Sequence, residues 1–103
     1  MMKRINIFAS CLQIVAEETE VSQEEILSES KIEDVVDARH LLAQLMFEMG
    51  LYPATIAQLI GCTTRNVNSI ISGFKLRCDR RKLLRNNYEK LRKDIGNICL
   101  TEL

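Results

Sequence analysis

The sequence has few of the residues on which catalytic and metal sites depend. The 103-residue chain has no tryptophan, one histidine and one proline, and only 5% of its residues are aromatic. Its four cysteines are widely scattered without a Cys-x-x-Cys pair, which argues against zinc ligation. His40 has no residue at a spacing that indicates a catalytic partner, and no Gly-x-x-x-x-Gly-Lys phosphate loop is present. We therefore expect no enzyme activity, metal, cofactor or small-molecule substrate.

Long apolar runs are also missing, so we expect no membrane partner, because a spanning helix needs about 18 or more such residues. Gln13 interrupts the apolar stretch near the N-terminus, which favours a first helix over a signal peptide. The content of 47% hydrophobic and 27% charged residues suits one globular domain over residues 1–103. Cysteines among apolar neighbours fit a reducing cytoplasm, where they pack as small hydrophobic residues.

The formal net charge of zero hides a strong asymmetry along the chain. Residues 1–60 carry four bases and ten acids, whereas residues 61–103 carry ten bases and four acids. The halves thus have net charges of −6 and +6. This asymmetry has two interpretations. The second half of the chain forms a basic face that binds a polyanion, or the charges of both halves simply lie on solvated helix surfaces.

The spacing of apolar residues is helical throughout and predicts an all-α domain of five or six helices. We expect helices near residues 6–19 and 32–49, the second ending at Gly50, with Ser22 capping a short helix between them. A further helix is expected at about 79–98, after a bend or break near 73–79. The predicted inward-facing residues of the two longer N-terminal helices are Ile7, Cys11, Ile14, Val15, Val35, Ala38, Leu42, Leu45 and Met49.

Residues 53–74 match a helix-turn-helix. Ala57 is small where the two helices come closest, Gly61 suits the left-handed backbone of the turn, and Val67 points back into the core. Pro53 favours the start of the first helix, and Thr63 or Thr64 favours the start of the second. In such motifs the second helix lies in the DNA major groove.

The order of these elements resembles the C-terminal DNA-binding domain of the bacterial replication initiator DnaA, within the Trp-repressor-like superfamily. The resemblance covers about residues 14–95 and is carried by residues 22–28 (SQEEILS), 38–40 (ARH) and 52–57 (YPATIA). It implies the same scaffold, with Arg39 reaching toward the minor groove and Lys31 contacting the DNA backbone. The family's Gly-Gly-Arg-Asp-His-Thr-Thr-Val signature is replaced by residues 61–67 (GCTTRNV), which implies a different target sequence.

Two groups of residues are predicted to contact duplex DNA. Arg65 can bond guanine O6 and N7 together, and Asn68 can do the same for adenine N6 and N7. The full set predicted to read bases is Thr63, Thr64, Arg65, Asn68, Ser69 and Ser72. The set predicted to contact phosphates, besides Lys31 and Arg39, is Lys75, Arg77, Arg80, Arg81, Lys82 and Arg85.

The apolar seam of the last predicted helix has two interpretations. It consists of Leu84, Tyr88, Leu91, Ile95 and Ile98. We favour packing onto the domain's own core, and the alternative is a homodimer formed through this helix. Arg77 and Arg81 interrupt the seam when it is extended backward.

The sequence therefore predicts a small DNA-binding protein of the nucleoid, which acts in transcription regulation or as an accessory replication factor. The alternative is a protein-interaction module on the same scaffold that no longer binds DNA. The missing signature residues favour the alternative, whereas the charge asymmetry and Arg65 favour DNA.

Overall fold

The chain is all-α, as predicted. The computed structural model describes the backbone of residues 4–102 and the side chains of residues 4–94. Within this range the chain forms six α-helices and no strand. They are α1 (Arg4–Thr19), α2 (Gln23–Ile26), α3 (Glu33–Glu48), α4 (Pro53–Ile60), α5 (Thr64–Arg80) and α6 (Lys82–Glu102).

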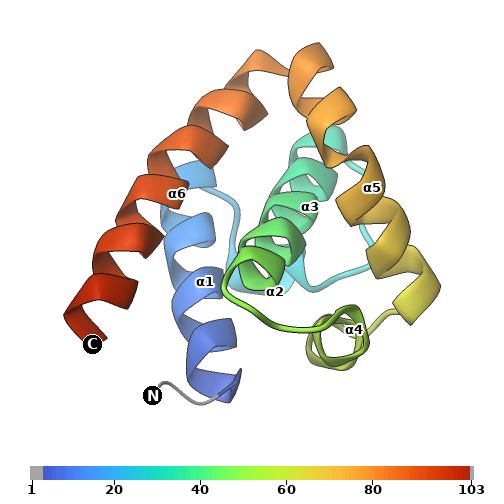
Figure 1. The fold of residues 1–103 in the computed structure, drawn as a ribbon. Coiled ribbons are helices and arrows are strands. Elements are labelled where there is room, and N and C mark those ends of the chain that lie inside the picture. The colour runs from blue at the N-terminus through green and yellow to red at the C-terminus, as the bar shows by residue number, and fades with distance from the viewer. Residues whose placement is uncertain (1–3, 103) are drawn as a thin grey trace.

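Helix α3 forms the centre of the domain and contacts all five other helices (Figure 1). Leu41, Leu42, Leu45 and Met46 are almost completely buried, so α3 presents apolar side chains around much of its circumference. Such a pattern is typical of a central helix. Helices α1 and α6 pack together on one flank of α3, and α4 and α5 pack together on the opposite flank.

The helix ends follow the local rules that the sequence indicated. The Ser22 hydroxyl accepts a hydrogen bond from the Glu25 amide at 3.2 Å, which caps α2. Gly50, which follows the C-cap residue Met49 of α3, has a positive φ of 98°. Its amide donates to the Phe47 carbonyl, and the Leu51 amide donates to the Met46 carbonyl. These two bonds form a Schellman motif, so the predicted role of Gly50 is confirmed.

Most of the predicted core is buried. Of the nine inward-facing residues predicted for the N-terminal helices, only Ile14 and Met49 are half-buried. The prediction missed Leu41, Met46 and, most importantly, the charged residue Asp37, which is only 8% exposed.

The predicted helix break was wrong in its position. Helix α5 does not end near Gly73 but continues to Arg80, because Phe74 and Cys78 extend its buried face. The break is the single residue Arg81, with φ −125° and ψ 93°. Gly73 is an ordinary helical residue with open space around it.

The described part of the C-terminal seam packs within the chain, as we favoured. Leu84 and Leu91 are buried in the common core. The Tyr88 ring lies edge-on to Phe74, with ring centroids 4.9 Å apart and an interplanar angle of 72°. Such an arrangement is favourable for aromatic pairs. Ile95 and Ile98 lie outside the residues whose side chains are described.

Cys62 and Cys78 are free thiols, the first half-buried and the second buried. Cys11 is buried. Cys99 lies outside the described side chains. Within the described residues, no group of three or more His, Cys, Asp or Glu side chains is placed to hold a metal ion. None of the described helices combines the length and apolar character needed to cross a membrane.

Candidate nucleic-acid interface

Helices α4 and α5 are joined by a three-residue turn that depends on Gly61. This glycine has φ 77° and ψ 38°, a left-handed conformation that costs glycine little. The amides of Gly61 and Cys62 both donate to the Ala57 carbonyl, at 2.9 and 3.0 Å. Ala57 and Val67 are buried in the common core. The left-handed conformation of Gly61 and the inward position of Val67 are thus confirmed, whereas the close approach of the helices at Ala57 stays a prediction.

The first turn of α5 is capped by Thr63. Its hydroxyl accepts a hydrogen bond from the Asn66 amide at 3.1 Å, so Thr63 rather than Thr64 is the N-cap. The first amides of any helix have no acceptor within the helix and lie at the positive end of its dipole. The start of α5 is consequently suited to lie against negatively charged groups.

All the residues predicted to read bases are exposed. Val67, Ile70 and Phe74 form the buried stripe of α5, and the polar residues lie on the rest of its surface. Arg65 has no hydrogen bond or ion pair with any residue whose side chain is described. The exposed residues of the predicted set are Thr63, Thr64, Arg65, Asn68, Ser69 and Ser72.

The second half of α5 differs in character from the first. Leu76 is 56% exposed on its outer surface, and Asp79 is exposed near its end; just beyond the break, Leu83 of α6 is 68% exposed. An apolar and an acidic side chain do not favour a phosphate backbone. The uninterrupted polar surface is therefore limited to the turn and the first part of α5, and the exposed bases farther along α5 lie among apolar and acidic neighbours.

Two of the predicted phosphate contacts are already bonded within the chain. Arg77 Nε donates to Asp37 Oδ1 at 2.6 Å, and Arg81 Nε donates to Asp37 Oδ2 at 2.7 Å. Arg81 also contacts Asp34 at 3.1 Å and Glu33 at 3.3 Å. The hydrogen bond to Asp37 raises the pKa of Arg81. These contacts join the start of α3 to the end of α5, so both arginines hold the fold together.

Arg39 likewise has a role within the fold. Its guanidinium donates to the carbonyls of Ile26, Ser28 and Ser30, at 2.9, 2.6 and 3.1 Å. These carbonyls lie at the end of α2 and in the link to α3, where a helix end leaves its acceptors unpaired. Arg39 therefore fastens the link onto α3, and the minor-groove contact implied by the family resemblance stays a prediction. Lys31 is exposed on the same link.

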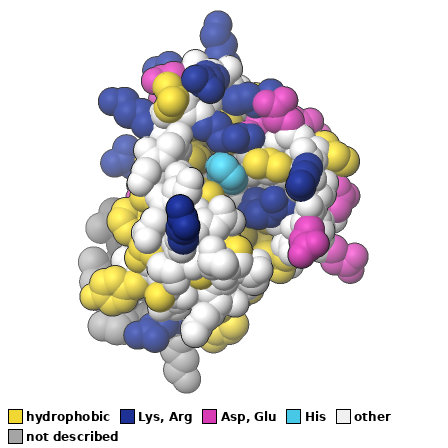
Figure 2. Space-filling view, turned by 90° about the vertical axis from the view of Figure 1, so that its right-hand side faces the viewer, with side chains coloured by type: hydrophobic (Ala, Val, Ile, Leu, Met, Phe, Trp, Pro, Cys, Tyr) yellow, Lys and Arg dark blue, Asp and Glu magenta, His cyan; other side chains and the backbone are white. Residues whose placement is uncertain are grey.

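Three of the predicted phosphate contacts remain exposed and unpaired among the described residues. They are Lys75, Arg80 and Lys82. Arg85 forms an exposed pair with Glu89 at 3.5 Å, one helical turn away. Such surface pairs are weak and exchange readily. Figure 2 shows lysine and arginine side chains gathered on the upper part of this face, with acidic side chains along one edge.

The charge asymmetry of the sequence has a structural role that neither interpretation included. Among the described residues, six of the seven ion pairs join an acid of residues 1–60 to a base of residues 61–103. Four of these pairs form the Asp37 cluster, in which Arg77 and Arg81 contact Asp37, Asp34 and Glu33. In addition, Lys90 contacts Glu18 at 3.0 Å and Arg92 contacts Glu48 at 3.3 Å. The oppositely charged halves thus meet within the fold, and fewer bases are left for an external partner.

His40 lies in a shallow groove beside the Asp37 cluster. The groove has a volume of about 290 Å³ and lies between α3 and α5. Burial, followed by the nearby Arg77 guanidinium, lowers the pKa of His40 to about 4. The imidazole is therefore neutral at physiological pH and adds no charge to this face. The residues that line the groove are Glu33, His40, Ser69, Ile70, Gly73, Leu76, Arg77, Arg80 and Arg81.

Comparison with known proteins adds no family to this description. No protein-family model matches the sequence, and no curated protein matches it.

Proposed function

We propose that this chain is a helix-turn-helix protein that binds duplex DNA through α5. The observation that carries the proposal is the exposed, unpaired Arg65 on the first turn of a helix that a tight glycine turn joins to α4. In a helix-turn-helix the second helix enters the major groove, and residues near its N-terminus contact base edges. The resemblance to the DnaA C-terminal domain supports the same orientation.

Within this proposal, α5 divides between specific and general contacts. Arg65 pairs with guanine and Asn68 with adenine, while the Thr63–Thr64 hydroxyls bond to either bases or phosphates. Lys75 and Arg80 of α5, together with Lys82 at the start of α6, supply sequence-independent attraction to phosphates. Each good bidentate pair contributes about 1–3 kcal/mol of discrimination between bases.

Beyond duplex binding, we propose a role as a small regulator of transcription or accessory replication factor on the cytoplasmic nucleoid, without enzyme activity. The altered residues 61–67 support a target other than the initiator's own.

The competing function is a protein-interaction module. The pairing of the two charge halves favours it, because Arg77, Arg81, Lys90 and Arg92 are occupied within the fold. The acidic side chains at the start of α3, Glu33 and Asp34, are however partly neutralised by Arg81. They therefore attract a basic partner less strongly.

A fluorescence-anisotropy titration with random duplex at about 50 and 200 mM salt tests the proposal. If Lys75, Arg80 and Lys82 contact phosphates, the affinity falls roughly 40-fold between these salt concentrations, through counterion release. The absence of binding at the lower salt concentration contradicts the proposal and leaves the protein-interaction module.

A further inference from the structure

The bend between α5 and α6 consists of one residue, Arg81, from which the two helices diverge (Figure 1). Helical hydrogen bonds continue on both sides of it. The Arg81 amide donates to the Arg77 carbonyl at 2.9 Å, and the Arg85 amide donates to the Arg81 carbonyl at 3.1 Å. In the described backbone, the amides of residues 82–84 have no bond to the carbonyls of residues 78–80. A helical conformation at Arg81 would bring these groups into register and join α5 and α6 into one helix.

The sequence around the bend does not itself interrupt a helix. Residues 74–95 contain neither glycine nor proline, and arginine has a good helix propensity. The φ of −125° and ψ of 93° at Arg81 are therefore imposed by contacts elsewhere in the fold. Its guanidinium contacts three acids at the start of α3: Asp37 at 2.7 Å, Asp34 at 3.1 Å and Glu33 at 3.3 Å. These ion pairs fasten the bend in its present shape.

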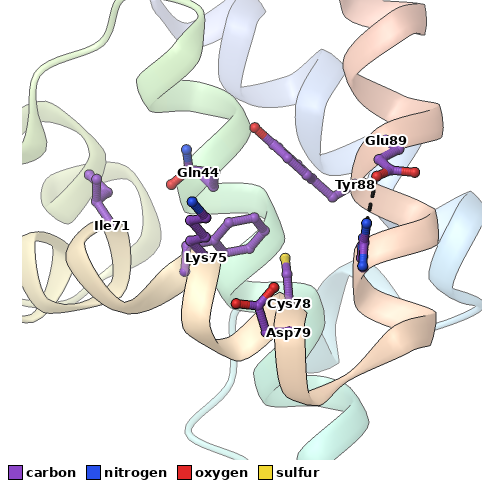
Figure 3. A pocket seen from close by; sticks show the side chains of 9 residues that line it. Gln44, Ile71, Lys75, Cys78, Asp79, Tyr88 and Glu89 are labelled. Atoms are coloured by element: carbon purple, nitrogen blue, oxygen red, sulfur yellow. Dashed lines mark hydrogen bonds and ion pairs between the residues drawn. The ribbon is translucent and has the colours of Figure 1, made fainter.

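Helix α6 is held by contacts that a second copy of the chain could supply equally well. Leu84 and Leu91, both only 2% exposed, pack in the core against the other helices, and Lys90 pairs with Glu18 of α1. The contact between α5 and α6 themselves is only partial, because a cleft of about 360 Å³ lies between them, with Cys78 on one side and Tyr88 on the other (Figure 3). None of these contacts requires that α6 belong to the same chain.

A straight helix would carry α6 away from its own domain. Residues 64–102 in one helix span roughly 58 Å, at about 1.5 Å per residue. The longest extent of the folded chain is 36 Å. The apolar stripe of α6, with Leu84, Tyr88 and Leu91, would then leave its own core, and its exposure to water is unfavourable. A second copy in the same conformation offers the matching site between α1, α3 and α5.

We propose that two copies of this chain form a dimer by exchanging α6, with Arg81 as the hinge. Each α6 occupies in the partner the site that it occupies in its own chain in the monomer. Both cores therefore keep their contacts, and only the bend changes, which makes exchange a low-cost route to a dimer. The arrangement differs from a coiled pair of α6 helices. It also does not depend on the proposed DNA binding.

A proline at residue 82 tests whether the hinge must straighten. Lys82 is the first residue of α6, where proline is well tolerated and favours an extended conformation at Arg81. In a continuous helix the same proline removes a hydrogen bond and clashes with the preceding turn. Each chain is refolded from urea at roughly 1 mM under reducing conditions, since exchange is favoured at high concentration. Size-exclusion chromatography with light scattering then gives the dimer fraction.

We expect a dimer from the unaltered chain and from the control Lys82→Ala, and at least about tenfold less dimer from Lys82→Pro. Arg81→Ala removes the ion pairs of the bend and keeps the helix propensity, so the dimerisation constant should rise by about tenfold. Arg80→Ala is its matched control and should leave the constant unchanged, because Arg80 is exposed and has no partner in the described part of the chain.

The rings of Phe74 and Tyr88 distinguish exchange from a dimer formed through surfaces. Their centroids are 4.9 Å apart, so an exchanged dimer made from isotope-labelled and unlabelled copies gives a nuclear Overhauser effect between the two chains. A dimer without this signal overturns the proposal. Equal dimer fractions for Lys82→Pro and Lys82→Ala, or no dimer from the unaltered chain, overturn it as well, whether or not Arg81→Ala folds.

Discussion

Asp37 of α3 and Arg77 of α5 are joined by a 2.6 Å hydrogen bond between residues 40 positions apart in the sequence. The other oxygen of the same carboxylate accepts from Arg81, at the break between α5 and α6. One buried acid thus fixes three helices relative to one another. It places the candidate DNA-binding helix and its basic continuation without itself facing a ligand.

Replacement of Asp37 by asparagine is expected to lower the free energy of unfolding by about 2–3 kcal/mol. Loss of one partner of a buried ion pair leaves the other charges uncompensated, and the two arginines here remain partly exposed, which lessens the cost. Urea denaturation followed by circular dichroism measures it. Asp34→Asn is the control, because Asp34 contacts the same Arg81 from an exposed position and its loss should change little. Equal effects of the two substitutions contradict the role given to Asp37.

The sequence contained the signal for this cluster, but it could not be interpreted from one element alone. Arg77 and Arg81 are spaced by one helical turn and interrupt an apolar seam, and Asp37 sits beside Ala38 on a face that is otherwise buried. Each looks like a defect in its own helix. Only the packing of α3 against α5 shows that the two irregularities complement each other.

Local signals predicted the fold better than they predicted the partners of its charges. The caps at Ser22 and Thr63 and the glycine ends at Gly50 and Gly61 depend on a few neighbouring residues, so they could be predicted from the sequence. The helix break was misplaced because Gly73 is a local signal that tertiary packing overrides. The exposure of Arg65 followed from helical periodicity, whereas the internal bonds of Arg39 depend on the path of a loop.

The pH dependence of stability is expected to report on His40. Its pKa is about 4 in the folded chain and 6.5 in the unfolded chain, so only the unfolded chain gains this proton between these values. The free energy of unfolding therefore falls as the pH drops from 6.5 toward 4, by about 1–2 kcal/mol for an imidazole that is only half-buried. His40→Gln removes this component, and denaturation at several pH values measures the difference. A variant with the same pH profile as the unaltered chain contradicts the assignment.

Phosphate contacts are expected to come only from the lysine and arginine side chains that have no partner within the described part of the fold. The double substitution Arg80→Gln/Lys82→Gln should reduce the slope of log affinity against log salt by roughly 2, because two counterion-releasing contacts are lost. Lys93→Gln is the control, since Lys93 is also exposed and unpaired among the described residues but lies eleven residues beyond Lys82 on α6. Anisotropy titrations with random duplex provide the slopes. The same reduction per lost charge in the control, roughly 1, would mean that the charge of the whole chain, rather than this surface, governs binding.

Base readout by Arg65 is expected to appear as a loss of specificity. Arg65→Ala should weaken binding to a site selected from random duplexes by about 1–3 kcal/mol and weaken binding to random duplex much less. Arg4→Ala, an exposed arginine of α1, should change neither affinity. Equal losses on both duplexes would show that Arg65 contacts only phosphate.

The most direct test of DNA binding through α5 is an NMR titration of the full chain with a duplex selected for binding. We predict that the amide signals of residues 63–72 shift most and that those of α1 shift little. Unchanged spectra, or shifts concentrated on α1 and α2, would contradict the assignment of this surface to DNA.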